Sequence, residues 1–137
     1  EKYTGITNLE EACRVIHDRG AFIACVTDGA NGSYFVWPDG TAYRCQPFPQ
    51  EHVVDTTGAG DSFHGAFLSK LAASIRQENA LHDEFIKPID ILQSLDHKQL
   101  ESAAIFASAV SALNTQGIGG RSALPSLETA RNLAGLE

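Results

Sequence analysis

The fold is decided by residues 55–63, which read DTTGAGDSF. Gly58 and Gly60 form a turn between a short apolar segment at 52–54 and a long helical pattern that starts near Gly60. In such a strand–turn–helix arrangement, the first backbone N–H groups of the helix lack an intrahelical acceptor, and the helix dipole favours negative charge beside them. The stretch therefore predicts an anion cradle, whose usual ligand is phosphate.

Two common phosphate-binding motifs do not fit this stretch. The dinucleotide-binding motif requires a third glycine where this chain has Phe63. A P-loop requires Lys and then Ser or Thr, but Ala66 and Phe67 follow Gly65. Backbone N–H groups and the helix dipole would therefore have to hold the phosphate without a lysine. Asp61 adds a carboxylate in the first helical turn, which suggests phosphoryl transfer to a hydroxyl; a turn that merely connects a strand to a helix is the alternative.

Composition narrows the function classes. The 137 residues are 43% hydrophobic, which is enough for one core. The net charge of −7 argues against a nucleic-acid partner, which requires a basic face. We expect no membrane partner, because no stretch approaches the ~20 apolar residues of a membrane span and no signal peptide is visible. Cys13, Cys25 and Cys45 have no CxxC spacing, so we expect reduced thiols in a cytoplasmic protein.

Helical and strand patterns alternate along the chain. Helices are expected at 9–19 with Asn8 as N-cap, from 60 onward, at 98–113 and from 126 onward. In the helix from 60 onward, apolar residues recur every fourth position and predict a stripe that faces the core: Phe63, Phe67 and Leu71, joined by Ala66 and Ile75. The continuous apolar run at 21–26 predicts a buried parallel strand. Pro38-Asp39-Gly40, between 33–37 and 41–46, predicts a hairpin. Residues 77–97 are polar and irregular, and Pro88 is expected to interrupt a possible short helix there.

The chain resembles the ribokinase-like (PfkB) carbohydrate kinases. Residues 54–67, VDTTGAGDSFHGAF, resemble the C-terminal signature of that family, and residues 26–32, VTDGANG, resemble its nucleotide-binding T-x-G-x-x-G motif. Residues 106–108 and 114–125 fall where the adenine-side helix and the closing loop of the family lie. The resemblance implies a three-layer α/β/α ribokinase-like sandwich. Residues 1–137 are expected to form its C-terminal nucleotide-binding and anion-hole part, with a mostly parallel sheet plus a hairpin.

The resemblance also implies roles for individual residues. The reaction would be ATP-dependent, Mg²⁺-assisted phosphoryl transfer to a sugar hydroxyl, with Asp61 as base. The anion hole would consist of Gly58, Ala59 and Gly60. The residues in contact with ATP would be Thr27, Gly29, Gly32, Gly60 and Ser108. The positions that match a monovalent-cation (K⁺) site are Asp55, Thr57, Asn114, Gly117 and Gly119.

Simpler interpretations of several of these residues stay open. The T-x-G-x-x-G stretch could be an ordinary hairpin turn, and Ser108 could be a small residue in a tightly packed helix. Asp55 could hydrogen-bond its own turn. The chain also departs from the family pattern at Ala123, where the last cation ligand is often Ser.

The acceptor half of the active site is not visible in this sequence. The sugar-binding residues, the lid and the N-x-x-E magnesium element of the family belong to an N-terminal half. Because the chain begins at Glu1 and family kinases are considerably longer, we expect it to be the C-terminal part of a larger protein and inactive alone. Three hypotheses stay open: a sugar kinase, a kinase of nucleosides or vitamin precursors, and a non-catalytic nucleotide-binding module. A homodimer of the complete protein is a further expectation.

Overall fold

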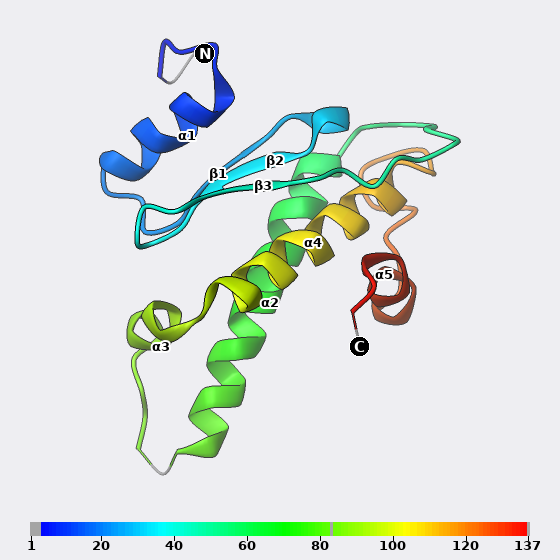
Figure 1. The fold of residues 1–137 in the computed structure, drawn as a ribbon. Coiled ribbons are helices and arrows are strands. Elements are labelled where there is room, and N and C mark those ends of the chain that lie inside the picture. Colours follow the sequence, from blue (N-terminus) through cyan, green and yellow to red (C-terminus); the bar gives the residue numbers. More distant parts are fainter. Residues whose placement is uncertain (1–3, 83, 137) are drawn as a thin grey trace. The chain divides into compact units, whose positions relative to one another are not determined.

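The computed structural model describes residues 4–82 and 84–136. It divides the chain into two compact units, Glu1–Pro49 and Gln50–Glu137, which we name the N-terminal unit and the C-terminal unit. Within the described residues, the N-terminal unit contains one α-helix and a three-stranded sheet, and the C-terminal unit contains four α-helices (Figure 1). Each unit is described separately below.

The first helix, α1, spans Leu9–Asp18. The side chain of Asn8 accepts a hydrogen bond from the Glu11 N–H at 2.9 Å, which confirms the predicted N-cap. The helix ends before Gly20, whose φ is +105° and whose N–H donates to the His17 carbonyl at 2.8 Å. Since glycine adopts this left-handed conformation readily, local signals at both ends determine the length of the helix.

The sheet of the N-terminal unit has the order β1-β2-β3, with both pairings antiparallel. Its strands are β1 (Ala24–Thr27), β2 (Ser33–Val36) and β3 (Ala42–Cys45). The predicted hairpin between β2 and β3 is confirmed: the Gly40 N–H donates to the Trp37 carbonyl at 2.9 Å across its turn. Trp37 is fully buried, and its ring stacks on Tyr43 with 5.6 Å between the ring centroids.

The parallel strand expected at 21–26 is wrong in direction and extent. β1 begins at Ala24 and, within the described residues, pairs only with β2, in the antiparallel direction. The apolar run did indicate burial correctly, because Ala24 packs with Cys13 of α1 and Val36 of β2 in a small core. The apolar content of a segment predicts that it is buried. The direction of its strand pairing depends on which other segment lies beside it in the sheet.

The C-terminal unit is built on two long helices that pack side by side. Its helices are α2 (Ala59–Leu81), α3 (Pro88–Ser94), α4 (His97–Asn114) and α5 (Leu127–Ala134). The main interface joins α2 to α4, while α5 packs on α4 and α3 packs on α2. The predicted stripe of α2 is confirmed, since Phe63, Phe67 and Leu71 are buried, and each contributes about 1.5–3 kcal/mol of hydrophobic stabilisation. Buried alanines of α4 allow the two helix backbones to approach closely.

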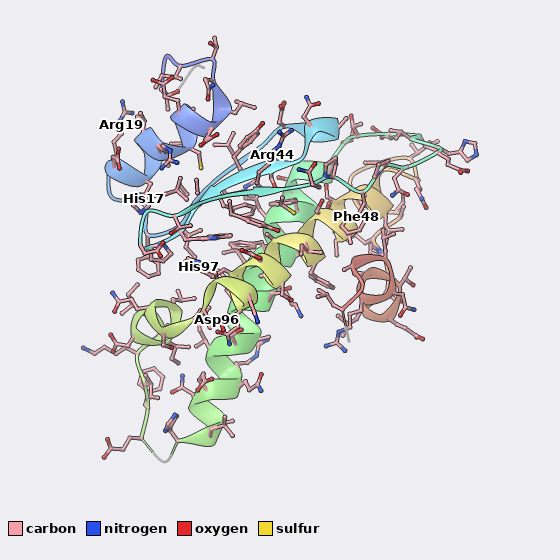
Figure 2. All side chains as sticks on the ribbon, viewed as in Figure 1. His17, Arg19, Arg44, Phe48, Asp96 and His97 are labelled. Carbon is pink, nitrogen blue, oxygen red and sulfur yellow. The ribbon has the colours of Figure 1, made fainter. Side chains whose placement is uncertain are left out.

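Two helix starts in this unit differ from the expectation. Pro88 is the first residue of α3 and does not interrupt it, because the missing N–H of proline costs nothing in the first helical turn. Figure 2 shows Asp96 at the start of α4, where its side chain accepts a hydrogen bond from the Gln99 N–H at 2.8 Å. The Gln99 side chain accepts in turn from the Asp96 N–H, which completes a capping box.

The segment before the glycine turn forms no strand, so the expected strand–turn–helix setting is wrong in its first part. Val53 and Val54 are exposed, and the N–H groups of Val54 and Asp55 both donate to the Thr115 carbonyl, at 2.8 and 3.1 Å. The segment therefore lies along the chain that follows α4. In the part of the chain that the structure describes, no helix is both long enough and apolar enough to cross a membrane.

Candidate functional site

The glycine turn leaves several backbone donors unused at the N-terminus of α2. Gly58 is the N-cap residue, and no side chain of the described residues caps the helix. The Ala59 N–H donates to the Thr56 carbonyl at 3.2 Å. By contrast, the N–H groups of Gly58, Gly60 and Asp61 have no hydrogen-bond acceptor among residues 4–82 and 84–136. Together with the helix dipole, these three donors make the turn suitable for an anion.

The turn requires glycine at position 58 for two reasons. Its φ of +75° lies in the left-handed region. In addition, a Cβ at Gly58 would lie 2.5 Å from the Gly120 carbonyl oxygen and 2.6 Å from the Gly120 Cα. The turn is thus in close backbone contact with the loop that follows α4, residues 115–125, which we name the closing loop.

Asp55 joins the turn to the closing loop. One carboxylate oxygen accepts from the Thr57 N–H at 2.8 Å, which is the local turn contact that the sequence allowed. The other oxygen accepts from the Gly119 N–H at 2.8 Å. The hydrogen bond from Gly119, followed by those from Thr57, lowers the pKa of the Asp55 carboxyl. Asp55 is therefore a carboxylate that holds two segments far apart in the sequence.

The buried side chain of Asn114 is hydrogen-bonded to the closing loop. This residue, at the end of α4, is fully buried, and its Nδ2 donates to the Gly120 carbonyl at 3.0 Å. Its Oδ1 is also buried but has no hydrogen-bond partner among the described residues. An unpaired buried oxygen is costly unless a donor or a cation reaches it. The loop itself is tight, since a Cβ at Gly117 would lie 2.8 Å from the Ala123 Cβ.

The structure thus brings most of the predicted cation residues together. Asp55 and Thr57 contact each other, Asp55 contacts Gly119, and Asn114 contacts Gly120, the next residue of the loop. No group of three His, Cys, Asp or Glu side chains that could hold a metal ion occurs in the described part of the chain. The residues therefore fit a cation bound by carbonyl and amide oxygens better than a Mg²⁺ site built from several carboxylates.

Asp61 is exposed in the first turn of α2, and its side chain has no hydrogen-bond or ion-pair partner among the described residues. The carbonyl of Ala59, two residues earlier, accepts hydrogen bonds from the hydroxyls of Ser62 at 2.9 Å and Ser111 at 2.8 Å. Sequence reasoning missed Ser111, which lies on α4. The only available signal was a serine within an alanine-rich helix, which does not reveal what the hydroxyl contacts.

The predicted nucleotide-contacting residues Thr27, Gly29 and Gly32 lie in the N-terminal unit. They occupy the end of β1 and the connection to β2, which contains a short 3₁₀ helix, η1 (Gly29–Asn31). Gly32 has a φ of +92°, and a Cβ there would overlap the Cys45 carbonyl oxygen, so this turn also requires glycine. Arg44, labelled in Figure 2, donates from Nη2 to the Asn31 carbonyl at 3.4 Å and thereby links η1 to β3.

Ser108, the remaining predicted contact with ATP, is buried in α4. This location agrees with the alternative of a small residue in a tightly packed helix.

Comparisons with known proteins place these features in a family. Residues 1–127 match the model of a protein family that is described as "pfkB family carbohydrate kinase". The bifunctional ribokinase/ribose-5-phosphate isomerase A of Fructilactobacillus sanfranciscensis is 29% identical over 127 residues, covering 93% of this chain and 19% of that protein. The cytidine kinase of Thermococcus kodakarensis is 33% identical over 66 residues, covering 48% of this chain and 24% of that protein.

A solved structure shows the same fold. It is a double mutant of the fructokinase of Vibrio cholerae O395 with fructose, ADP and potassium ion bound. It matches with a TM-score of 0.71 and 24% sequence identity, covering 96% of this chain and 36% of that chain. The expected ribokinase-like fold is thereby confirmed, and the chain spans well under half the length of each of these three proteins. On the match over residues 1–127, the chain belongs to the PfkB family of carbohydrate kinases.

Proposed function

We propose that this chain provides the nucleotide-binding and anion-hole part of a kinase that transfers a phosphoryl group from ATP to a hydroxyl of a sugar. The observation that carries the proposal is the turn at Gly58. It presents three N–H groups that have no acceptor among the described residues, in the same helical turn as the exposed Asp61. Its shape is maintained by the backbone of Gly120 and by the carboxylate of Asp55.

The anion hole would act through backbone groups. The N–H groups of Gly58 and Gly60 would donate to the transferring phosphate, where negative charge is spread over its oxygens in a loose transition state. Ala59 would contribute chiefly through its small side chain, because its N–H already donates to the Thr56 carbonyl. Since these donors sit on a turn held in place by other contacts, little reorganisation would be needed when the charge develops.

Asp61 would accept the proton of the acceptor hydroxyl. Support comes from the position of Asp61 in the first helical turn, within the stretch that supplies these N–H groups, so proton acceptance and phosphate binding would occur side by side. Removing a general base of this kind typically costs about 10²–10⁴ in turnover.

Thr27, Gly29 and Gly32 would contact the nucleotide phosphates, and Ser108 would lie on the adenine side. The turn at Gly32 supports the phosphate role through its fixed shape, because a Cβ there would overlap the Cys45 carbonyl oxygen and only glycine fits. Mg²⁺ would accompany the phosphates of ATP, where it neutralises charge on the transferring group. The described residues by themselves offer no carboxylate cluster for it.

A monovalent cation, K⁺, would stabilise the loop around the anion hole. Its ligands would come from Asp55, Thr57, Asn114, Gly117 and Gly119. Support comes from the buried, unpaired Oδ1 of Asn114 and from the Asp55 carboxylate beside Gly119. The structurally similar fructokinase of Vibrio cholerae also carries a potassium ion.

A nucleoside is the main alternative to a sugar as the acceptor of the phosphoryl group. The relatives include the cytidine kinase of Thermococcus kodakarensis as well as a ribokinase, so a nucleoside could take the place of the sugar. A panel of sugars and nucleosides, tested with ATP and the complete gene product, would identify the acceptor.

The role of Asp61 is tested by Asp61→Asn in the complete gene product. Turnover should fall by about 10²–10⁴ while nucleotide affinity stays within a few fold, because the phosphate donors are unchanged. Asp90→Asn is a matched control, since Asp90 is the acidic residue in the first turn of α3 and is also exposed. It removes a similar helix-dipole interaction and should leave turnover unchanged. Full turnover in Asp61→Asn would exclude Asp61 as the base.

A further inference from the structure

Ser111 contacts the peptide group that carries a donor of the proposed anion hole. The Ala59 carbonyl and the Gly60 N–H belong to one peptide unit, which is planar and trans. The two groups point in opposite directions, so any contact that fixes the carbonyl also fixes the direction of the N–H. Ser111 Oγ donates to this carbonyl at 2.8 Å.

Ser111 is the contact that connects this peptide group to a second helix. Ser62 Oγ also donates to the Ala59 carbonyl, at 2.9 Å, but Ser62 belongs to α2 and moves with it. Ser111 lies 52 residues further along the chain, on α4. Its hydroxyl therefore connects this peptide group of α2 to α4.

Hydrogen bonds to a carbonyl also change the N–H of the same peptide. A donor at the carbonyl oxygen polarises the amide and makes its N–H a better donor, and such effects are cooperative in a partly buried site. The Gly60 N–H has no acceptor of its own among the described residues, so the added polarity is available to a ligand. Ser62 and Ser111 together would thus strengthen the donor as well as orient it.

We propose that Ser111 is a positioning residue for phosphoryl transfer, which holds and polarises the Ala59–Gly60 peptide so that the Gly60 N–H faces the transferring phosphate. This inference rests on the proposed kinase function. It assigns to α4 a direct part in shaping the anion hole, in addition to its packing against α2.

The test is Ser111→Ala in the complete gene product, with kcat and KM for ATP measured separately. We expect kcat to fall about tenfold, less than the loss of a direct oxyanion donor, while KM for ATP changes by less than about twofold. Affinity for ADP with aluminium fluoride, which imitates the transferring phosphate, should fall by a similar factor to kcat. Ser111→Thr keeps the hydroxyl and should restore most of the turnover.

Ser69→Ala is the matched control. Ser69 Oγ donates to the Ala66 carbonyl at 2.8 Å within α2, away from the turn, and the residue is exposed. This variant loses the same type of hydrogen bond and should keep wild-type kcat. If Ser111→Ala proves too unstable to assay, Ser111→Cys, with its weak S–H donor, should show the partial loss of kcat instead.

Three results would overturn the proposal. The first is wild-type kcat in Ser111→Ala, or in Ser111→Cys if that is the variant assayed. The second is an equal loss of kcat and of ATP affinity together with a lowered Tm, which indicates a structural role only. The third is the same loss of kcat in Ser69→Ala. Asp61→Asn distinguishes failure of the proposed kinase function from failure of the role proposed for Ser111. If Asp61→Asn loses turnover while Ser111→Ala does not, the kinase function is supported and the role of Ser111 is refuted. If Asp61→Asn keeps full turnover, both the proposed kinase function and the role of Ser111 are refuted.

Discussion

Replacing Gly58 by alanine tests whether the anion-hole turn depends on its contact with the closing loop. The added Cβ would lie 2.5 Å from the Gly120 carbonyl oxygen, 2.6 Å from the Gly120 Cα and 2.9 Å from its carbonyl carbon. All three neighbours are backbone atoms, so no flexible side chain can move aside. The backbone of residue 58 also has a φ of +75°, which alanine adopts only with strain.

The loss in the free energy of unfolding that we expect for Gly58→Ala has two parts. The left-handed conformation costs about 1–2 kcal/mol for a residue with a Cβ. Overpacking against a fixed backbone costs about 1–3 kcal/mol more. A gain of about 0.4–1 kcal/mol from the less flexible unfolded chain offsets part of this. The net loss in the free energy of unfolding is therefore about 2–4 kcal/mol, a large share of the stability of an ordinary domain.

Urea unfolding followed by far-ultraviolet circular dichroism would measure this loss, because the helices of the C-terminal unit dominate that signal. Gly135→Ala is the matched control: Gly135 has a φ of +66°, but a Cβ there would meet nothing within 4 Å. It should lose only the conformational part, about 1 kcal/mol. Gly120→Ala should be tolerated, since its Cβ would lie 3.8 Å from the Gly58 Cα.

The comparison between Gly58→Ala and Gly135→Ala is decisive. If both variants lose the same stability, the contact with Gly120 does not restrain the turn, and the reasoning about the closing loop is refuted. If Gly58→Ala also retains wild-type turnover in the complete gene product, the turn geometry is not needed for the proposed anion hole.

Three further predictions concern charge, cation and thiol chemistry. Because the folded-state pKa of Asp55 is lowered, its contribution to stability is present above the ordinary carboxyl pKa of about 4 and is lost as the pH falls below it. The difference in unfolding free energy between the wild type and Asp55→Asn should therefore shrink on acidification, and a constant difference would contradict this. Replacing K⁺ by tetramethylammonium should lower turnover of the complete gene product but not that of Asp55→Asn, and equal effects on both would argue against the cation site. Burial, with smaller effects of Cys13 and Cys45, raises the pKa of Cys25 to about 12, so Cys25 should react slowly with a disulfide reagent at about pH 8 in the native protein and quickly after denaturation. Mass spectrometry would locate the label, and rapid native labelling of Cys25 would be inconsistent with its burial.

Local sequence signals predicted the elements of secondary structure well. Asn8 caps α1 as expected, and the turn at Gly40 joins β2 to β3. The stripe of Phe63, Phe67 and Leu71 lies in the core. Such predictions succeed because caps, turns and helical periodicity depend on residues only a few positions apart.

Predictions that depended on neighbours in space were less successful. The apolar run at 21–26 was expected to be a parallel strand, but β1 pairs antiparallel with β2. The segment at 52–54 was expected to form a strand, but it bonds to Thr115 through single backbone contacts instead. In both cases hydrophobicity indicated where the chain could be buried and could not indicate which segment would lie beside it.

The sequence by itself determined the family, the glycine turn at 58–60 and the carboxylate of Asp61 beside it, because these features lie within nine consecutive residues. Only the tertiary structure decided how that turn is held. Gly120 against Gly58, Gly119 on Asp55, and Ser111 on the Ala59 carbonyl all join residues more than 50 positions apart. No local pattern specifies such contacts, since they arise only when α4 packs against α2 and brings the closing loop to the turn.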